Sequence, residues 1–399
     1  MKAIQEATFP VRNSAPSMSM VVILSLGTFI VFFQGFMVAP IMPQLASLFH
    51  VSIQKVSFIE PAYLLSYGLS TLLYTPLSDK YGRLPVITFS ITGFIVLTAC
   101  TGFVTSVNEM ILLRLLTGCI SGGVAPTTIS WIGDQFPYEK RGHALGIFFG
   151  FMAGGTALGS SAGALLTGII GWRFLFWIVS MIGFVILVII RLNRRSFTQL
   201  KSNTSLSPQQ MFAAYKNLLH LSRARRTYIY VFLNAMFHSG VFAWLGYFFY
   251  KNYHLNETEI GYALLGYGIP GLLLGPFLGK LADKYGRNRI IPIGIFIGAL
   301  SAFLLGMNYS LLFSCLIIAT LSLAFDMTHP LFAAISTTLS KQKGVAIGFF
   351  AFVMFMGYGV GSLVFSLIIN LGINESLKIF GLFALIVAAF SLFSFRHEK

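Results

Sequence analysis

The chain has 399 residues, of which 56% are hydrophobic and only 12 are Asp or Glu. A soluble domain needs many more charged residues to cover its surface, so this composition excludes an ordinary soluble protein and indicates a chain that lies in a bilayer. A net charge of +15 suggests nucleic acid as a partner, but the placement of the basic residues argues against it.

Apolar stretches recur along the whole chain at the length that a membrane helix needs, roughly 20 residues. The first 19 residues are polar and carry no cleavage pattern, so we expect the first apolar stretch to be retained as an anchor. Twelve spans are predicted, over residues 20–48, 56–77, 85–105, 108–132, 142–168, 172–191, 228–252, 258–280, 289–308, 311–338, 344–369 and 375–395.

The basic residues are concentrated in alternate loops. If both termini are cytoplasmic, the loops and tails on that side hold most of the 27 Lys and Arg, whereas the opposite side holds only Lys55, Arg173, Lys251 and Lys378. This asymmetry is the positive-inside rule. It predicts a multi-pass protein of the plasma membrane, the inner membrane in a bacterium, with both termini cytoplasmic. Membrane lipids are then expected partners, and nucleic acid is not.

One hydrophilic phrase occurs twice, as TPLSDKYGRLP from Thr75 and as GKLADKYGRNR from Gly279, 204 positions later. Each copy follows the second span of a set of six, and the longest hydrophilic gap separates the two sets. An internal repeat of this period predicts two related bundles. We therefore expect an N-terminal bundle over 1–193, a basic cytoplasmic linker over 194–227 and a C-terminal bundle over 228–399.

Two sets of six spans, a basic central loop and the pattern G-x-x-x-D-[RK]-x-G-R in both halves resemble the major facilitator superfamily of secondary transporters, and the drug/proton antiporter branch most closely. The second copy fits the pattern fully, whereas Thr75 replaces its glycine in the first. The resemblance implies an all-α membrane fold of twelve helices in two pseudo-symmetric six-helix bundles. The residues of this cytoplasmic gate motif are Asp79, Lys80, Gly82, Arg83, Gly279, Asp283, Lys284, Gly286 and Arg287.

Each motif aspartate can accept hydrogen bonds from free N–H groups at the start of a neighbouring helix, where the helix dipole favours negative charge. We expect Asp79 to meet the eleventh span near Gly344, and Asp283 to meet the fifth near Gly142. The resemblance implies that such contacts latch the cytoplasmic side in the outward-open state. The alternative is an ordinary polar loop.

Small residues recur at steps of four in several spans, and they predict where helices approach closely and where the two halves touch. Static packing is the alternative for any one of them. Gly159-Ser160 stands where the resembling antiporters carry Gly-Pro. The ridges are Gly155, Gly159 and Gly163; Gly271, Gly275 and Gly279; Ala62, Ser66 and Ser70; and Gly357 and Gly361.

Charged residues inside spans are expensive and therefore candidates for function. Arg114 and Gly118 resemble the R-x-x-x-G motif of the superfamily's fourth helix, and Glu60 lies at a similar depth in the second span. We expect these two charges to form a pair. The alternative for Glu60 is a position in the outer headgroup zone, with its carboxylate directed to water.

The second half contains a further group of ionisable residues. Asp326 and His329 are three residues apart in the tenth span and share a helical face. His238 lies in the seventh span, with Asn234 one turn away. The resemblance implies that these helices line a central cavity, so together with Glu60 and Arg114 they are candidates for proton coupling. The alternative is a neutral structural histidine, with Asp326 bracing the helix before Pro330.

The first span contains Gln34 but no carboxylate, which makes a lipophilic cation a poor candidate for the substrate. A neutral, zwitterionic or anionic molecule suits the hydrogen-bonding side chains better. The predicted cavity residues are Gln34, Tyr67, Thr127, Asn234, Tyr267 and Tyr358.

No nucleotide loop, metal-ligand spacing or nucleophile pattern is found, so we expect no enzyme activity, no catalytic residue, no metal and no cofactor other than the coupling proton. The expected function is a proton-coupled, alternating-access transporter of the rocker-switch type, a monomer that exports a small amphipathic drug or metabolite. A proton-coupled importer and a lipid flippase are the alternatives.

Overall fold

The computed structural model describes residues 18–136, 138–194, 208–267, 281, 284–340 and 343–398, apart from the side chains of 138–142, 208, 343 and 344. Every regular element within these ranges is a helix. In chain order they are α1 (Met18–Phe36), η1 (Ala39–Ile41), α2 (Met42–Leu48), α3 (Ile53–Ser57), α4 (Ile59–Tyr81), α5 (Arg83–Thr101), α6 (Val107–Ser121), α7 (Val124–Gln135), α8 (Tyr138–Ile170), α9 (Trp172–Leu192), α10 (Pro208–His220), α11 (Ser222–Phe242), α12 (Leu245–Tyr253), a helical stretch at 257–267, α14 (Arg287–Leu305), α15 (Leu311–Ser336), α16 (Lys343–Ile368), η3 (Ile369–Leu371) and α17 (Ile373–Ser394).

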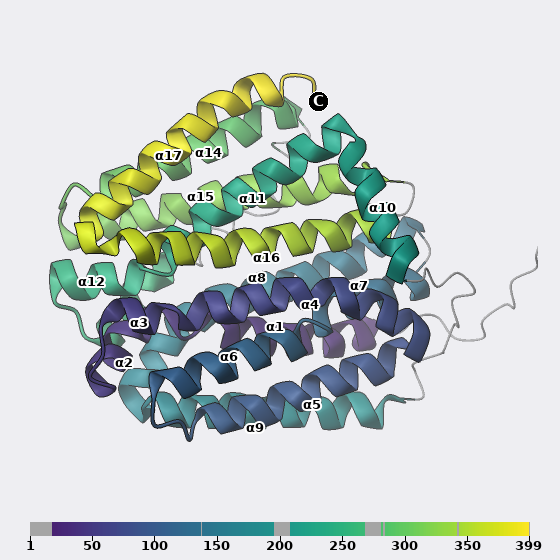
Figure 1. Ribbon diagram of the computed structural model, residues 1–399, viewed down its shortest axis with the longest axis horizontal. Coiled ribbons are helices and arrows are strands. Elements are labelled where there is room, and N and C mark those ends of the chain that lie inside the picture. The colour runs from purple at the N-terminus through teal and green to yellow at the C-terminus, as the bar shows by residue number, and fades with distance from the viewer. Residues whose placement is uncertain are drawn as a thin grey trace, which may run out of the picture.

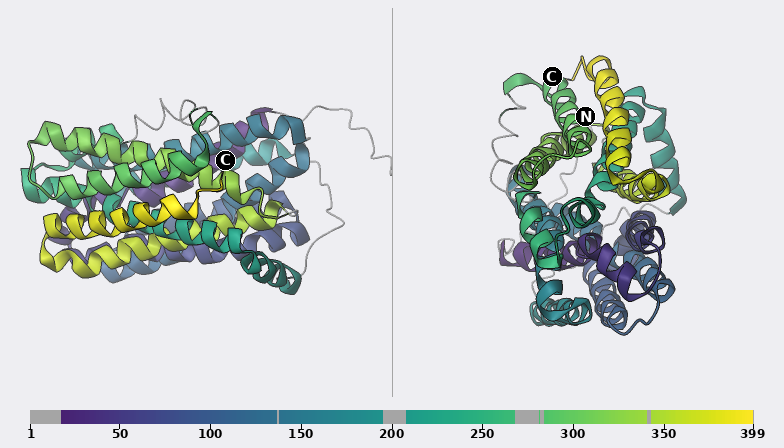
Figure 2. Two further views of the ribbon diagram at one scale, coloured as in Figure 1. Left: turned by 90° about the horizontal axis from the view of Figure 1, so that it is seen from above. Right: turned by 90° about the vertical axis from the view of Figure 1, so that its left-hand side faces the viewer.

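The long helices lie side by side, with α1 to α9 in the lower part of Figure 1 and α11 to α17 in the upper part. The end-on view also shows these two groups (Figure 2). We call residues 18–194 the N-terminal half and residues 208–398 the C-terminal half. One end of the bundle carries α2, α3 and α12 and is called the α12 end, and the opposite end carries α10 and is called the α10 end.

Ten stretches of the described helices are long and apolar enough to cross a membrane. The second predicted span corresponds to α4, which is 23 residues long but is interrupted by polar side chains and is not among the ten. The eighth predicted span, 258–280, lies mostly outside the described residues. The structure therefore shows an all-helical protein with many membrane spans, and the count of twelve stays a prediction.

The predicted linker at 194–227 is partly helical. It contains α10 and the first residues of α11, so the seventh span begins at Ser222, earlier than predicted. In α10 the buried side chains Met211, Tyr215 and Leu218 are spaced at four and three residues, which places them on one helical face. The sequence analysis missed this helix because the segment is mostly polar and only one of its faces is apolar.

The glycine of the repeated phrase has the same backbone conformation in both copies. Gly82 separates α4 from α5 with φ +94° and ψ 154°, and Gly286 precedes α14 with φ +87° and ψ 147°. This region is essentially restricted to glycine, because a β-carbon is strained there. The repeated Gly is thus required by the turn itself.

The predicted glycine ridges lie inside each half. A β-carbon at Gly155 or Gly159 of α8 would meet the backbone oxygens of Phe29 and Phe33 in α1, at 2.5 and 2.6 Å. Gly357 of α16 faces the backbone oxygen of Phe232 in α11 at 2.6 Å. The prediction that these ridges mark contacts between the halves was wrong, because a four-residue spacing indicates close approach but does not specify the partner. The ridge at Gly271, Gly275 and Gly279 lies outside the described residues.

The contact between α8 and α1 leads to a prediction for stability. Replacing Gly159 by Leu is expected to lower the free energy of unfolding by about 1–3 kcal/mol, because the added side chain would overlap the α1 backbone. The matched control is Gly146→Leu in the same helix, where no described atom lies within 4 Å of an added β-carbon. Thermal unfolding in detergent measures both, and equal melting temperatures for the two variants would contradict the assignment.

Candidate functional site

Arg114 is fully buried between α6, α1 and α4. Its Nη1 donates hydrogen bonds to the backbone oxygen of Gln34 at 3.0 Å and to the side-chain Oε1 of Gln34 at 2.8 Å, and its Nη2 donates to the backbone oxygen of Gly35 at 2.7 Å. These carbonyls are available because α1 ends at Phe36, so its last turn has no intrahelical donors. The guanidinium also lies 4.1 Å from the ring centroid of Tyr63. Arg114 thus joins three helices.

Glu60 lies close enough to Arg114 for their charges to interact, but the two form no direct hydrogen bond. The side chain is 1% exposed, and neither carboxyl oxygen has a hydrogen-bond partner among the described residues. The alternative of a carboxylate directed to water is therefore wrong. The predicted ion pair with Arg114 is not formed, because the guanidinium is directed to the end of α1 instead.

Two histidines of the C-terminal half stack on the same phenylalanine. His238 Nε2 lies 2.6 Å from the hydroxyl of Tyr267, and the imidazole stacks on Phe325 with centroids 3.7 Å apart. His329 stacks on the same phenylalanine at 5.0 Å. The sequence analysis selected His238, His329 and Tyr267 but missed Phe325, whose only sequence signal is its position four residues before His329 on the same helical face.

Asp326 has a sparse polar environment. Its carboxylate accepts a hydrogen bond from Ser322 at 3.4 Å and lies near enough to Tyr358 for an electrostatic interaction. Across the described part of the chain it makes no ion pair with either histidine. Asn234, expected beside these groups, donates to Thr328 at 3.0 Å. Asp326 is therefore a partly buried carboxylate with one weak hydrogen-bond donor.

The predicted cavity residues fall into two groups. Gln34 is engaged by Arg114, and Tyr267 by His238. The hydroxyls of Tyr67 and Thr127 are buried and have no hydrogen-bond partner among the described residues, so they remain available to a ligand. Tyr358 packs edge-to-face against Phe36, with ring centroids 6.3 Å apart.

Aromatic side chains connect the two halves beside these polar groups. Phe355 of α16 packs against Tyr67 of α4 at 4.4 Å and Phe32 of α1 at 5.8 Å, and Phe36 of α1 packs against Phe242 of α11 at 5.9 Å. A pocket bordered by His238, Phe325 and neighbouring residues has a volume of about 10 Å³, the lower limit for one water molecule. The aromatic contacts thus join α1 and α4 of the N-terminal half to α11 and α16 of the C-terminal half.

The first copy of the repeated phrase forms a charge network within its own half. Arg83 pairs with Asp79 at 2.5 Å and with Asp134, at the end of α7, at 3.0 Å. Asp134 was missed by the sequence analysis, because a single carboxylate near a span end carries no pattern. Lys80 and Lys284 each lie 5.2 Å from the ring centroid of the tyrosine that follows.

The contacts that would form the predicted latch lie outside the described residues. Gly279 and Asp283 are not described, and neither are the side chains near Gly142 and Gly344. The pairing of Asp79 and Asp283 with neighbouring helix N-termini therefore stays a prediction.

The halves contact each other closely at the α12 end. The hydroxyls of Ser57 and Ser366 are 2.5 Å apart, and Gln54 donates to Asn370. Glycines allow the same closeness elsewhere: an added β-carbon at Gly168 would lie 3.2 Å from the backbone nitrogen of Thr258. Toward the α10 end, Gly146 and Gly150 of α8 have no described neighbour within 4 Å of an added β-carbon.

Ionisable residues inside membrane-spanning helices, such as Arg114 and Asp326, commonly mark substrate or ion pathways. The model of the Major Facilitator Superfamily matches residues 24–250 and 227–399, and the chain belongs to this superfamily of transporters, which are not enzymes. It is 24% identical to the uncharacterized MFS-type transporter YwfA of Bacillus subtilis (strain 168), over 85% of this chain and 82% of that protein. It is 25% identical to the efflux pump radE of Floropilus chiversii, over 86% of this chain and 75% of that protein.

The fold is also that of a solved structure. A bacterial homolog of the human lysosomal transporter Spinster, in an inward-facing and unoccupied conformation, matches with a TM-score of 0.76 and 17% sequence identity, covering 96% of this chain and 98% of that one. The same protein in an inward-facing, occupied conformation matches with a TM-score of 0.74. At this level of identity the similarity shows the fold alone.

The Arg114 cluster leads to a second stability prediction. Arg114→Ala is expected to cost about 3–5 kcal/mol, because it leaves the Glu60 carboxyl buried without a compensating charge. Adding Glu60→Gln to Arg114→Ala is expected to recover at least about 1 kcal/mol of that loss. Thermal unfolding in detergent gives both values.

Arg173→Ala is the matched control for this cycle, because Arg173 also donates to a backbone oxygen, of Val104 at 3.1 Å, and also lies over an aromatic ring, but is exposed. It is expected to cost less than about 1 kcal/mol. Strictly additive effects of the Glu60 and Arg114 changes would refute the electrostatic coupling.

Proposed function

We propose that this member of the Major Facilitator Superfamily is a proton-coupled secondary transporter that exports a small amphipathic compound by alternating access. The observation that carries the proposal is Asp326. It is an ionisable side chain within a membrane-spanning helix, it has one weak hydrogen-bond donor in the part of the chain that the structure describes, and it lies near Tyr358. Such residues are expensive in a membrane and commonly serve proton transfer.

Alternating access is supported by the close contact between the halves at the α12 end, where the hydroxyls of Ser57 and Ser366 lie 2.5 Å apart. By the positive-inside rule we assign the α10 end, with both termini, to the cytoplasm. The α12 end then faces outside, and it must separate for substrate release there.

The substrate class follows from the available hydrogen-bonding groups. The hydroxyls of Tyr67 and Thr127 have no hydrogen-bond partner among the described residues, Tyr67 packs against Phe355, and the N-terminal half carries the buried cation Arg114. These features suit a neutral, zwitterionic or anionic amphipathic molecule. Export is supported by relatives named as efflux pumps, radE and PmrA of Streptococcus pneumoniae.

The test is transport into proteoliposomes with an imposed pH gradient and a panel of amphipathic compounds of each charge class. An antiporter accumulates its substrate on the acidic side, and a symporter accumulates it on the alkaline side, whichever way the protein is inserted. We expect accumulation in an acidic lumen that a protonophore abolishes. Accumulation in an alkaline lumen would show an importer, and transport insensitive to the protonophore would reject proton coupling.

A further inference from the structure

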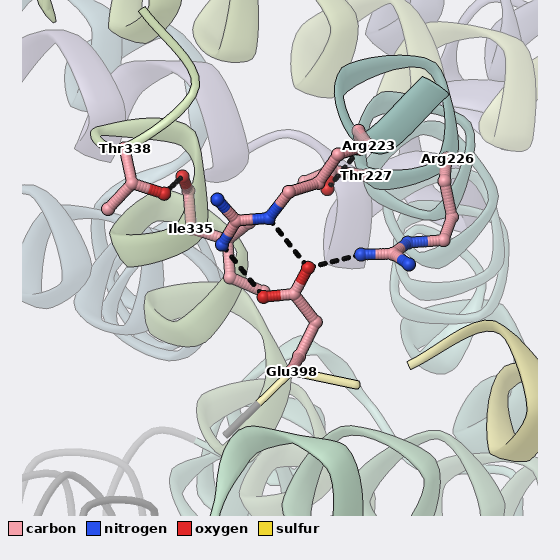
Figure 3. A network of polar contacts seen from close by, with 6 residues as sticks. All are labelled: Arg223, Arg226, Thr227, Ile335, Thr338 and Glu398. Carbon is pink, nitrogen blue, oxygen red and sulfur yellow. Dashed lines mark hydrogen bonds and ion pairs between the residues drawn. The ribbon is translucent and has the colours of Figure 1, made fainter. Parts of the chain in front are cut away.

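The C-terminal tail folds back onto the beginning of α11 (Figure 3). The Glu398 carboxylate accepts hydrogen bonds from Arg223 Nε at 2.7 Å and Arg223 Nη2 at 2.8 Å, and it also pairs with Arg226. The backbone oxygen of Glu398 accepts a hydrogen bond from the N–H of Asn288, in the first turn of α14, at 2.8 Å. Two guanidinium groups thus hold one carboxylate where α11 and α14 begin and α17 ends.

We call Arg223, Arg226 and the cavity beside them the arginine site. It has more positive charge than one carboxylate neutralises and more volume than one carboxylate fills. Two guanidinium groups face a single carboxylate, and Arg226 Nε has no hydrogen-bond partner among the described residues. The site opens into a cavity of about 480 Å³ lined by Ser222, Arg223, Arg226, His397 and Glu398. A water molecule takes up about 30 Å³, so the cavity can admit a group much larger than a carboxylate.

Glu398 is well suited to act as a resident anion. Hydrogen bonds from Arg223, reinforced by the charges of Arg223 and Arg226, hold the pKa of its carboxyl below the ordinary value. The carboxylate is therefore charged at neutral pH, and it binds the two arginines in the same way as an external anion would. Its side chain is 7% exposed, whereas that of Arg223 is 44% exposed. A ligand can thus reach the arginine without first entering the bundle.

The arginine site lies beside an apolar outer surface. Ile229 in α11 and Phe390 and Phe393 in α17 are 56%, 65% and 74% exposed. In a protein of this family such surfaces contact the acyl chains of lipids. A basic site at the end of the helices, next to an acyl-contacting face, is the arrangement that binds anionic head groups.

We propose that Arg223 and Arg226 form a binding site for a phosphate group, presented by an anionic membrane lipid or as free phosphate, and that Glu398 competes with it. Phosphate oxygens match the planar donor fork of arginine in the same bidentate manner as a carboxylate. Binding displaces Glu398 and frees the tail from Asn288, so the ligand controls whether α11, α14 and α17 are tied together. This site is separate from the central charged residues and does not depend on the direction of transport.

The test measures binding to the purified full-length protein in detergent by native mass spectrometry, with dioctanoyl phosphatidylglycerol, dioctanoylglycerol and inorganic phosphate as separate probes. We expect the protein to retain more dioctanoyl phosphatidylglycerol than dioctanoylglycerol, because only the former carries a phosphate. Arg223→Ala with Arg226→Ala should weaken it about tenfold or more, and Glu398→Gln should strengthen it about tenfold. The control Arg225→Ala removes an exposed charge from the same turn and should change affinity less than about twofold.

Each arm of this experiment decides one part of the proposal. Displacement of dioctanoyl phosphatidylglycerol by millimolar inorganic phosphate would identify free phosphate as a ligand of the site, whereas retention of this lipid unaffected by phosphate would identify the lipid as the ligand. An equal loss in Arg225→Ala and in the double variant would overturn the site in favour of general charge attraction. If the double variant does not fold, Glu398→Gln still decides the competition, and unchanged affinity in this variant would overturn it.

Discussion

Oxidation of a Ser57→Cys/Ser366→Cys variant is expected to stop transport almost completely. The two hydroxyl oxygens are 2.5 Å apart and belong to α3 and α16, so the sulfur atoms that replace them can form a disulfide. That bond would hold the α12 end closed. A protein that alternates between two openings cannot complete a cycle with one opening fixed, so substrate movement should fall below about a tenth of the reduced protein's rate.

The experiment needs a background in which Cys100, Cys119 and Cys315 are replaced by Ser. The two single-cysteine variants serve as controls and should keep their activity after oxidation. Adding a reductant to the oxidised double variant should restore transport. If the cross-link forms, as a gel shift after proteolysis would show, and transport continues at the original rate, separation of the α12 end is not part of the cycle.

The Asp326→Asn variant is expected to lose accumulation against a gradient while still exchanging substrate between the two sides. The amide is nearly isosteric and can still accept a hydrogen bond from Ser322, 3.4 Å away in the native protein, but it cannot gain and lose a proton. A proton can drive substrate only if its binding changes the relative energies of the two states. Without a proton that binds and leaves at residue 326, the imposed pH gradient cannot drive the substrate.

The assay for Asp326→Asn combines pH-driven uptake with counterflow at equal pH in the same proteoliposomes. Uptake should drop to the level of empty vesicles, and counterflow should persist. Glu375→Gln is the matched control, since Glu375 is an exposed carboxylate of α17 paired with Lys378 at 2.7 Å, and it should behave as the native protein does. Normal pH-driven uptake by Asp326→Asn would remove Asp326 from the coupling mechanism.

Composition and periodicity were enough to predict a helical membrane protein, because both depend on local residue types. They could not place helix breaks. The end of α1 at Phe36 lies inside the predicted span 20–48, yet that break exposes the carbonyls that Arg114 binds. The sequence therefore identified Arg114 and Gln34 as separate candidates, and only the fold shows that they form one cluster.

The sequence analysis also missed Phe325 and Glu398, because their roles depend on tertiary contacts. Phe325 is one of 40 phenylalanines, and its position four residues before His329 is too weak a signal to identify it as the ring that stacks on both His238 and His329. Glu398 stands among basic residues in the tail, where a lone acidic residue is a weak signal. Its partners Arg223 and Arg226 are more than 170 positions away, a separation that residue patterns cannot bridge.

The glycine contacts between α8 and α1, and between α16 and α11, have a mechanical consequence. Where two backbones touch with no side chain between them, neither helix can roll or slide without a collision. We therefore expect α8 and α1 to move together, and likewise α16 and α11. A molecule built in this way has few independent moving parts.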